Sequence, residues 1–315
     1  MHFMKSVESN RTLDVSAVSA QAQSDATSLI AAEEARYRRE IGTVADRILA
    51  HDTHRHIVLL SGPSSSGKTT TAAYLQTLLG ERGVAAHVVS LDDFYLGRGR
   101  APRLPDGSFD YETIDALDVD RLLCCMRELI QIGKTQMPIF DFHDGKPAQE
   151  TRTLQLEEHA AVIFEGIHAF NPRLQTCLPD DMVNRVFINT LSRFENEGER
   201  WLARRDIRLC RRILRDDQFR NSPFDNTMTM WPQVVRGENL YLFPFAEIAD
   251  CVIDTTLAFE PCILKDMLLS RLQKVNENSA YADVAQYLTE RLSAFPSLPL
   301  TMLPKDSLLR EFTGQ

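Results

Sequence analysis

The chain has 315 residues, of which 43% are hydrophobic and 25% are charged, a composition that is typical of a globular protein and excludes disorder over the whole length. Acidic residues (44) outnumber basic residues (35), and the net charge of −9 provides no overall positive field for nucleic acid or anionic lipid. The six cysteines form no C-x-x-C pair, which argues against structural zinc and disulfide scaffolds and is typical of a reducing compartment.

The N-terminal region contains no apolar run long enough for a signal peptide, and no run of about 18 apolar residues occurs in the chain. We therefore expect a cytoplasmic protein without membrane or nucleic-acid partners. Residues 1–27 are rich in Ser, Ala and Gln and are predicted to form a flexible tail. Residues 28–50 carry apolar side chains at helical spacing, which predicts an amphipathic helix.

Short apolar runs alternate with helical stretches along the rest of the chain. The predicted buried strands are residues 56–61, 86–91, 160–164, 185–189 and 251–254. The predicted helices are residues 69–82, 119–132, 197–220 and 263–275. This alternation predicts an α/β fold with an open, mainly parallel sheet, helices on both faces and a site at the carboxyl edge.

Two further regions complete the expected organisation. Residues 97–111 are rich in Pro, Gly and charge and are predicted to form a surface loop. Residues after 281 are predicted to form a helix followed by a Pro-rich tail. We expect one domain over residues 28–270 and a C-terminal helical extension over residues 271–315.

The strongest motif follows the first predicted strand directly. It reads Gly62-Pro-Ser-Ser-Ser-Gly67-Lys68-Thr69-Thr70 and matches the phosphate-binding loop G-x-x-x-x-G-K-[ST] between a strand and a helix. The motif predicts the fold of a P-loop NTPase, with ATP and Mg²⁺ as ligands. We expect Lys68 to reach the β and γ phosphates and the Thr69 hydroxyl to ligate Mg²⁺. The predicted nucleotide-binding residues of the loop are Gly62, Ser65, Ser66, Gly67, Lys68, Thr69 and Thr70.

The absence of other motifs narrows the reactions in which the bound nucleotide could take part. The D-x-x-G and N-K-x-D motifs of GTPase switches are absent, and so is the L-S-G-G-Q-like signature of transporter ATPases. Phosphoryl transfer to a small acceptor therefore remains as the predicted chemistry. The alternative interpretation of the loop itself is a chance turn rich in Gly and Ser.

Two carboxylates follow predicted strands and are candidates for the chemistry. Asp92 comes directly after the second strand, where it would accept the proton of an attacking hydroxyl. Glu165 ends the third strand and would hold Mg²⁺ directly or through water. The alternatives are a solvated cap for Asp92 and a water-facing acid for Glu165.

Arginine is concentrated in one segment, with nine in the 28 residues from Arg193 to Arg220. Four of them lie at i, i+4, i+7 and i+11 and predict a cationic stripe on one helical face, with Arg212 beside it: Arg204, Arg208, Arg211 and Arg215. The abundance of Arg over Lys indicates bidentate phosphate binding, by a lid over about residues 197–236. A solvated charged face is the alternative.

Six segments in this order resemble the phosphoribulokinase and uridine kinase family, and uridine kinases most closely: GPSSSGKTT, SLDDFY, FDYETIDALD, PIFDFHDGKP, VIFEGIHAFNPRL and RLCRRILRDDQFR. The resemblance covers about residues 57–263. It implies a P-loop kinase that transfers the γ phosphate of ATP to a primary hydroxyl, the 5′-hydroxyl if the acceptor is uridine or cytidine. Relatives in the family also suggest a homo-oligomer.

The resemblance also implies roles for individual residues. Asp92 matches the catalytic base of the family and Glu165 its metal-associated acid, while Lys68 and Thr69 match the phosphate loop. Tyr95 matches a tyrosine near the nucleoside. Lid arginines that touch the acceptor and the phosphates are matched by Arg212, Arg215 and Arg220, of which Arg215 is also predicted to be catalytic, together with Asp92 and Lys68.

The predicted acceptor pocket departs from uridine kinases. Glu112 replaces an Asp that grips the ribose hydroxyls, and Phe140 replaces a Tyr that contacts the base; both are predicted to line the pocket. A His expected later falls at Gly145, although His143 is close in sequence, and a later Arg and Gln fall at Ser222 and Met230. The sequence therefore keeps open two alternatives: the same fold acting on another alcohol or a sugar phosphate, and a nucleotide-binding regulatory protein without catalysis.

Overall fold

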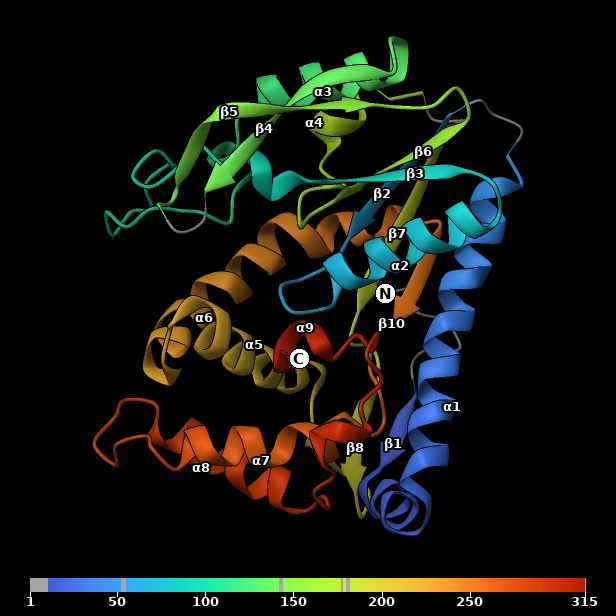
Figure 1. Cartoon of the computed structure of the whole chain (residues 1–315). Coiled ribbons are helices and arrows are strands. Elements are labelled where there is room, and N and C mark those ends of the chain that lie inside the picture. Colours follow the sequence, from blue (N-terminus) through green and yellow to red (C-terminus); the bar gives the residue numbers. More distant parts are fainter. Residues whose placement is uncertain (1–10, 52–54, 142–143, 177, 180–181, 315) are drawn as a thin grey trace.

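The centre of the molecule is a five-stranded parallel sheet with the strand order β10-β7-β2-β6-β3 (Figure 1). The computed structural model describes residues 11–51, 55–141, 144–176, 178–179 and 182–314. The strands of the sheet are β2 (Arg55–Ser61), β3 (Ala85–Ser90), β6 (Ala160–Glu165), β7 (Val183–Asn189) and β10 (Cys251–Asp254). All five coincide with apolar runs of the sequence, so the predicted strands and the α/β class are confirmed.

Helices cover both faces of this sheet. Because successive side chains of a strand point to opposite faces, Val58 belongs to one apolar core and Leu59 to the other. The core with Val58 is covered by α1 (Val15–Leu49), α2 (Lys68–Glu81), α5 (Arg204–Arg220) and α7 (Glu260–Leu272). The core with Leu59 is covered by α3 (Val119–Gln131) and the short α4 (Pro172–Gln175).

The N-terminal region is part of the folded domain. The strand β1 (Thr12–Asp14) pairs with β8 (Arg193–Asn196), and Asp14 caps α1 by accepting a hydrogen bond from Ala17 N at 2.8 Å. The expectation of a flexible tail is therefore wrong for residues 11–27, and residues 1–10 lie outside the described residues. The helix escapes detection because few of its first residues are apolar, although Val15 and Val18 are buried.

The predicted helix over residues 197–220 begins too early. Glu197 and Gly198 both have positive φ, 51° and 83°, and two such residues form a tight turn that favours a hairpin. The chain therefore returns as β9 (Glu199–Leu202), which pairs antiparallel with β8. α5 begins only at Arg204, and α6 (Phe224–Gly237) follows it.

An antiparallel hairpin was not predicted from the sequence. It consists of β4 (Lys134–Asp141) and β5 (Lys146–Gln155) and lies beside α3 (Figure 1). β5 is almost entirely exposed, so it lacks the alternation of apolar and polar residues that indicates a strand. The hairpin brings Phe140 toward the site described below.

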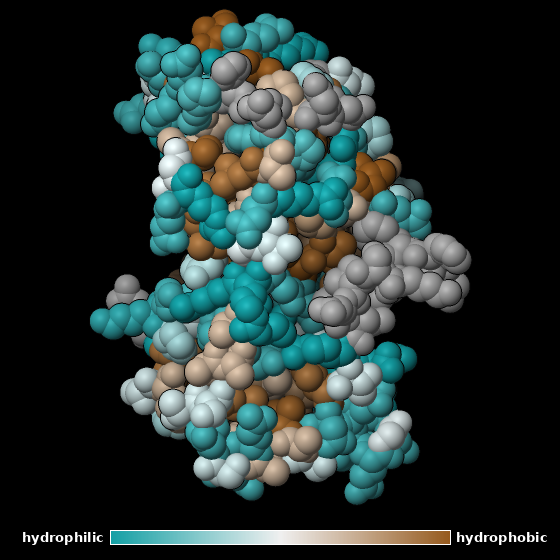
Figure 2. Space-filling model, turned by 90° about the vertical axis from the view of Figure 1, so that its right-hand side faces the viewer, coloured by the Kyte–Doolittle hydropathy of each residue, from teal (hydrophilic) through white to brown (hydrophobic). Residues whose placement is uncertain are grey.

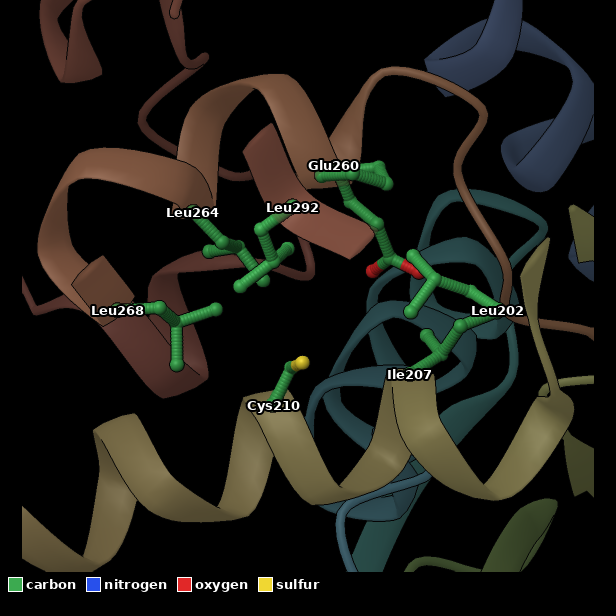
Figure 3. A pocket seen from close by; sticks show the side chains of 8 residues that line it. Leu202, Ile207, Cys210, Glu260, Leu264, Leu268 and Leu292 are labelled. Atoms are coloured by element: carbon green, nitrogen blue, oxygen red, sulfur yellow. The ribbon is translucent and has the colours of Figure 1, made fainter. Parts of the chain in front are cut away.

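The C-terminal region packs on the rest of the domain. α8 (Ala282–Ser293) confirms the helix expected after residue 281, and α9 (Arg310–Thr313) follows near the C-terminus. Leu288 of α8 and Phe312 of α9 belong to the same apolar core as Val58 of the sheet. A small apolar pocket of about 10 Å³ lies between α5, α7 and α8 and is lined in part by Cys210 and Leu264 (Figure 3).

The surface formed by α1 is mostly hydrophilic. Figure 2 shows this side of the molecule, where hydrophobic residues occur only in small groups between polar ones. Within the described ranges, no helix combines the length and the apolar character needed to cross a membrane.

Candidate active site

The phosphate-binding loop connects β2 to α2 and is shaped by its two glycines. A Cβ on Gly62 would lie 2.3 Å from the carbonyl oxygen of Ile188, so no larger residue fits there. Gly67 has a φ of +91°, which glycine adopts without strain. Ser65 and Ser66 are buried, and their hydroxyl oxygens have no hydrogen-bond partner among the described residues. A bound phosphate could accept hydrogen bonds from these two hydroxyls. It could also accept them from the N–H groups at the start of α2, because the first N–H groups of a helix have no partner within the helix.

Lys68 and two arginines of α5 surround this loop. The Lys68 ammonium donates a hydrogen bond to the carbonyl of Pro63 at 3.1 Å. Arg208 donates to the carbonyl of Ser64 at 3.1 Å, and Arg212 donates to the Ser64 hydroxyl at 2.9 Å. α5 therefore packs directly against the loop.

Asp92 and Glu165 lie at the carboxyl edge of the sheet. β3 ends at Ser90, and Asp92 follows in a 3₁₀ turn (Leu91–Phe94). Glu165 is the last residue of the neighbouring β6, and its carboxylate accepts a hydrogen bond from the Ser90 hydroxyl at 3.0 Å. Both carboxylates interact electrostatically with Lys68. The structure thus brings together Lys68, Asp92 and Glu165, although Lys68 and Glu165 are 97 positions apart in the sequence.

Desolvation raises the pKa of both carboxyl groups. For Asp92 it outweighs the opposing effects of Lys68, Arg220 and Arg215, even though the side chain keeps accessible surface, because protein atoms surround it closely. For Glu165, desolvation and the charge of Asp92 raise the pKa, and Lys68 opposes them. A raised pKa makes a carboxylate a better proton acceptor, which suits a general base.

The donor set fits a magnesium ion that is bound together with a nucleotide. Mg²⁺ typically takes one or two carboxylates, substrate phosphates and water as ligands. Glu165 offers a carboxylate at the strand end, and Thr69 offers a hydroxyl at the start of α2. The described part of the chain contains no cluster of three or more His, Cys, Asp or Glu side chains arranged for a metal. A site built by the protein alone is therefore not observed there.

Arg208 and Arg211 are held by buried ion pairs. Arg208 donates to Glu238 at 2.8 Å, and Arg211 donates to Glu260 and to the carbonyl of Thr255, both at 2.7 Å. The guanidinium groups of both arginines are fully enclosed by protein. The expectation that the whole stripe binds phosphate is therefore wrong for these two arginines, because their acidic partners come from distant parts of the chain.

The other three predicted lid arginines share one carboxylate. Asp216 is fully buried and pairs with Arg212 at 3.1 Å, Arg215 at 2.9 Å and Arg220 at 3.7 Å. The charges of Arg215 and Arg220 also act on the pKa of Asp92, which places these arginines near the candidate base. Asp216 therefore organises the cationic groups that face the site.

Aromatic and acidic residues adjoin Asp92. The rings of Tyr95 and Phe140 lie 5.8 Å apart, centre to centre, at an angle of 58°. Glu112 interacts electrostatically with Arg212 and Asp92, and burial raises the pKa of its carboxyl group to about 7. Burial also raises the pKa of Tyr95 well above its usual value. The structure thus groups the residues that the sequence predicts for the acceptor pocket.

The structure describes three of the positions that depart from uridine kinases. Gly145 has a φ of +66°, a conformation that strains residues other than glycine, and a Cβ there would displace the side chain of Arg98. Met230 is exposed on α6, and Ser222 is half-buried after the end of α5. His143, the suggested substitute, lies outside the described residues.

Two contributors to the site were not predicted from the sequence. Ser90 lies two residues before Asp92 and could have been found as the residue that caps the turn containing Asp92. Asp216 is an acid within the arginine-rich helix, but its burial and its three partners are not visible in the sequence.

Comparisons with known proteins show what this chain is similar to. A family model described as the phosphoribulokinase / uridine kinase family matches residues 57–190. A uridine kinase of Brevibacillus brevis is 28% identical over 200 residues, which cover 62% of this chain and 83% of that protein. The uridine-cytidine kinase-like 1 protein of Mus musculus is 28% identical over 249 residues, which cover 76% of this chain but only 42% of that protein.

Among solved structures, one described as a possible uridine kinase from Bacillus stearothermophilus covers 69% of this chain and 98% of its own chain. Its TM-score is 0.47 at 18% sequence identity. Residues 57–190 are thus similar to the phosphoribulokinase / uridine kinase family.

Proposed function

We propose that this protein is an ATP- and Mg²⁺-dependent kinase that phosphorylates the 5′-hydroxyl of a pyrimidine nucleoside, uridine or cytidine. One observation carries the proposal: Lys68, Asp92 and Glu165 converge at the carboxyl edge of the sheet, next to a phosphate-binding loop. Arginines of α5 line the same place, so cationic groups and a proton acceptor are available together.

The chemistry follows from the roles of these residues. Asp92 takes the proton of the acceptor hydroxyl while the oxygen of that hydroxyl forms a bond to the γ phosphorus. The bond from the γ phosphorus to the bridging oxygen breaks, and ADP leaves. Lys68, Arg212 and Arg215 offset the negative charge of the transferred group. A Mg²⁺ ion held by Thr69 and Glu165 would neutralise charge on the phosphates.

The shape of the acceptor region supports a nucleoside. Tyr95 and Phe140 supply aromatic faces against which a planar base can pack. Glu112 supplies a carboxyl group for hydroxyls of a sugar, and Asp92 lies within its electrostatic reach. The relatives named above are described as uridine or uridine-cytidine kinases, which agrees with this acceptor.

A panel of acceptors tests this function. The protein is incubated with ATP and Mg²⁺ and, in separate reactions, with uridine, cytidine, purine nucleosides, sugar phosphates and pantothenate-like alcohols. ADP release is measured, and the product is identified by mass. We expect a nucleoside 5′-monophosphate from uridine or cytidine; a blank for all nucleosides would contradict the proposed acceptor.

A second acceptor class is favoured by a specific observation. Three polar residues expected in a uridine kinase pocket are replaced here by Gly145, Ser222 and Met230. A pocket without these hydrogen-bonding groups discriminates differently between acceptors. Product from a sugar phosphate or another alcohol, with none from nucleosides, would assign this function, whereas ATP binding without any product would favour a regulatory protein.

A further inference from the structure

The C-terminal segment, residues 303–314, lies directly on the phosphate-binding loop. Figure 1 shows α9 beside the loop that leads into α2, although the two are separated by most of the chain. Leu308 of this segment lies so close to Gly67 that a Cβ on the glycine would be 2.4 Å from it. Leu308, Leu309 and Phe312 are completely buried, so the contact is a packed interface.

Glu311 reaches the start of α2 from this segment. Its carboxylate accepts a hydrogen bond from the Thr70 hydroxyl at 2.6 Å and another from the Thr70 backbone N–H at 3.4 Å. Thr70 is the third residue of α2, where backbone N–H groups have no partner within the helix. The carboxylate therefore occupies donors of a residue that we expect to bind the nucleotide at the start of the helix.

Several contacts hold the segment in this position. Asp306 pairs with Arg38 of α1 at 2.7 Å, and the guanidinium of Arg310 donates to the carbonyls of Leu303 at 2.6 Å and Pro304 at 3.2 Å. These contacts fold the segment on itself and attach it to the domain, so Glu311 is presented to Thr70 by a formed structure.

We propose that Glu311 is an autoinhibitory group that competes with the triphosphate for Thr70, and that the segment is a plug which nucleotide binding must displace. Two anions cannot share the same donors, and like charges placed side by side repel each other. The bound nucleotide therefore requires the carboxylate to withdraw, and this requirement lowers the affinity of the resting protein for ATP. The inference depends on the nucleotide binding proposed above.

Binding of ATP and Mg²⁺ without acceptor, followed by calorimetry, tests this competition. Glu311→Gln keeps the size of the side chain and removes its charge, and we expect it to bind ATP at least about tenfold more tightly than the unchanged protein. Asp306→Asn is the matched control, because it removes a carboxylate of the same segment whose pair with Arg38 is exposed and adds little to the buried packing that holds the segment. We expect this variant to bind ATP within about twofold of the unchanged protein.

Each outcome is informative. If Glu311 only caps α2, its loss weakens or leaves unchanged the affinity for ATP, and the competition is refuted. If neither the unchanged protein nor Glu311→Gln binds ATP, the proposed nucleotide binding fails and the plug fails with it. If these two proteins bind ATP equally well, only the plug is refuted.

Amide hydrogen exchange of the unchanged protein gives a readout that needs no variant. We expect faster exchange in residues 308–314 when ATP is added, and unchanged protection at saturating ATP would overturn the proposal.

Discussion

Asp92 is the residue at which the proposed phosphoryl transfer is tested most directly. Asp92→Asn removes the proton acceptor while keeping the size of the side chain, so we expect turnover to fall by at least about a hundredfold. ATP binding should remain nearly intact, because Asp92 serves the acceptor hydroxyl. The measurement is steady-state ADP release with the acceptor identified by the panel.

The neighbouring acid provides the control for this variant. Asp93 directly follows Asp92, and burial raises the pKa of its carboxyl group as well. Its charge interacts with Arg152 on the exposed hairpin, away from the phosphate loop. We expect Asp93→Asn to keep turnover within about threefold, since its side chain accepts a hydrogen bond from the Phe140 backbone that an asparagine oxygen can also accept. Equal losses in both variants would remove Asp92 from the mechanism.

Glu112 makes stability depend on pH. Its pKa is raised to about 7 in the folded protein, mainly by burial, from its usual value of 4.5. Because the folded state binds this proton more tightly than the unfolded state, the contribution of Glu112 to stability is greatest below pH 4.5 and is lost as the pH rises through 7. The ionised side chain is thus a cost above neutral pH.

Replacing this acid should remove the pH dependence it causes. We expect Glu112→Gln to be more stable than the unchanged protein at pH 8, by at most about 3 kcal/mol, and nearly equal to it at pH 5. Urea unfolding between these pH values measures the difference. Glu277→Gln, at an exposed position, is the control, and its stability should differ from that of the unchanged protein by the same small amount at both pH values. A gain of stability in Glu112→Gln that is the same at both pH values would contradict this account.

At the scale of elements, α5 is organised by Asp216. This carboxylate is fully buried and pairs with Arg212, Arg215 and Arg220. Removing the charge of a buried ion pair leaves its partners uncompensated, so we expect Asp216→Asn to lower the free energy of unfolding by about 3–5 kcal/mol. The arginines would also lose their alignment, which should raise the KM for ATP. Urea unfolding and steady-state kinetics measure the two effects.

The next residue on the same helix is a matched control. Asp217 pairs with Arg271 at 2.6 Å, but its side chain is 41% exposed. Exposed ion pairs contribute little to stability, so we expect Asp217→Asn to cost less than about 1 kcal/mol and to leave the KM for ATP unchanged. Similar losses in both variants would show that the burial of Asp216 has no special role.

The same helix shows where prediction from sequence ends. The spacing of arginines correctly indicates a helix from Arg204 onward, because helical periodicity is a local property of the chain. It does not tell which arginines remain free to bind a ligand. The partners Glu238 and Glu260 lie 30 and 49 residues further along the chain, so these pairs form only when α5, α6 and α7 pack together.

At the scale of the whole molecule, α1 joins the N-terminal region to the core. Val18 is buried on this helix, whereas Ala20 is exposed two residues later. We expect Val18→Asp to lower the free energy of unfolding by at least about 2 kcal/mol, because it buries a charge without a partner. Ala20→Asp should change it by less than about 0.5 kcal/mol. Urea unfolding compares the two variants, and equal stability would restore the interpretation of these residues as a tail.

The sequence alone determined the class of the fold, the five strands of the sheet and the loop that fits phosphate. These features depend on local patterns, since a strand shows itself by its apolar run and the loop by residues that are adjacent in the chain. The tertiary structure alone decided which arginines are neutralised by buried ion pairs and that the C-terminal segment lies on the phosphate-binding loop. Thr70 and Glu311 are 241 positions apart, and such contacts depend on the packing of every element between them, which no local pattern records.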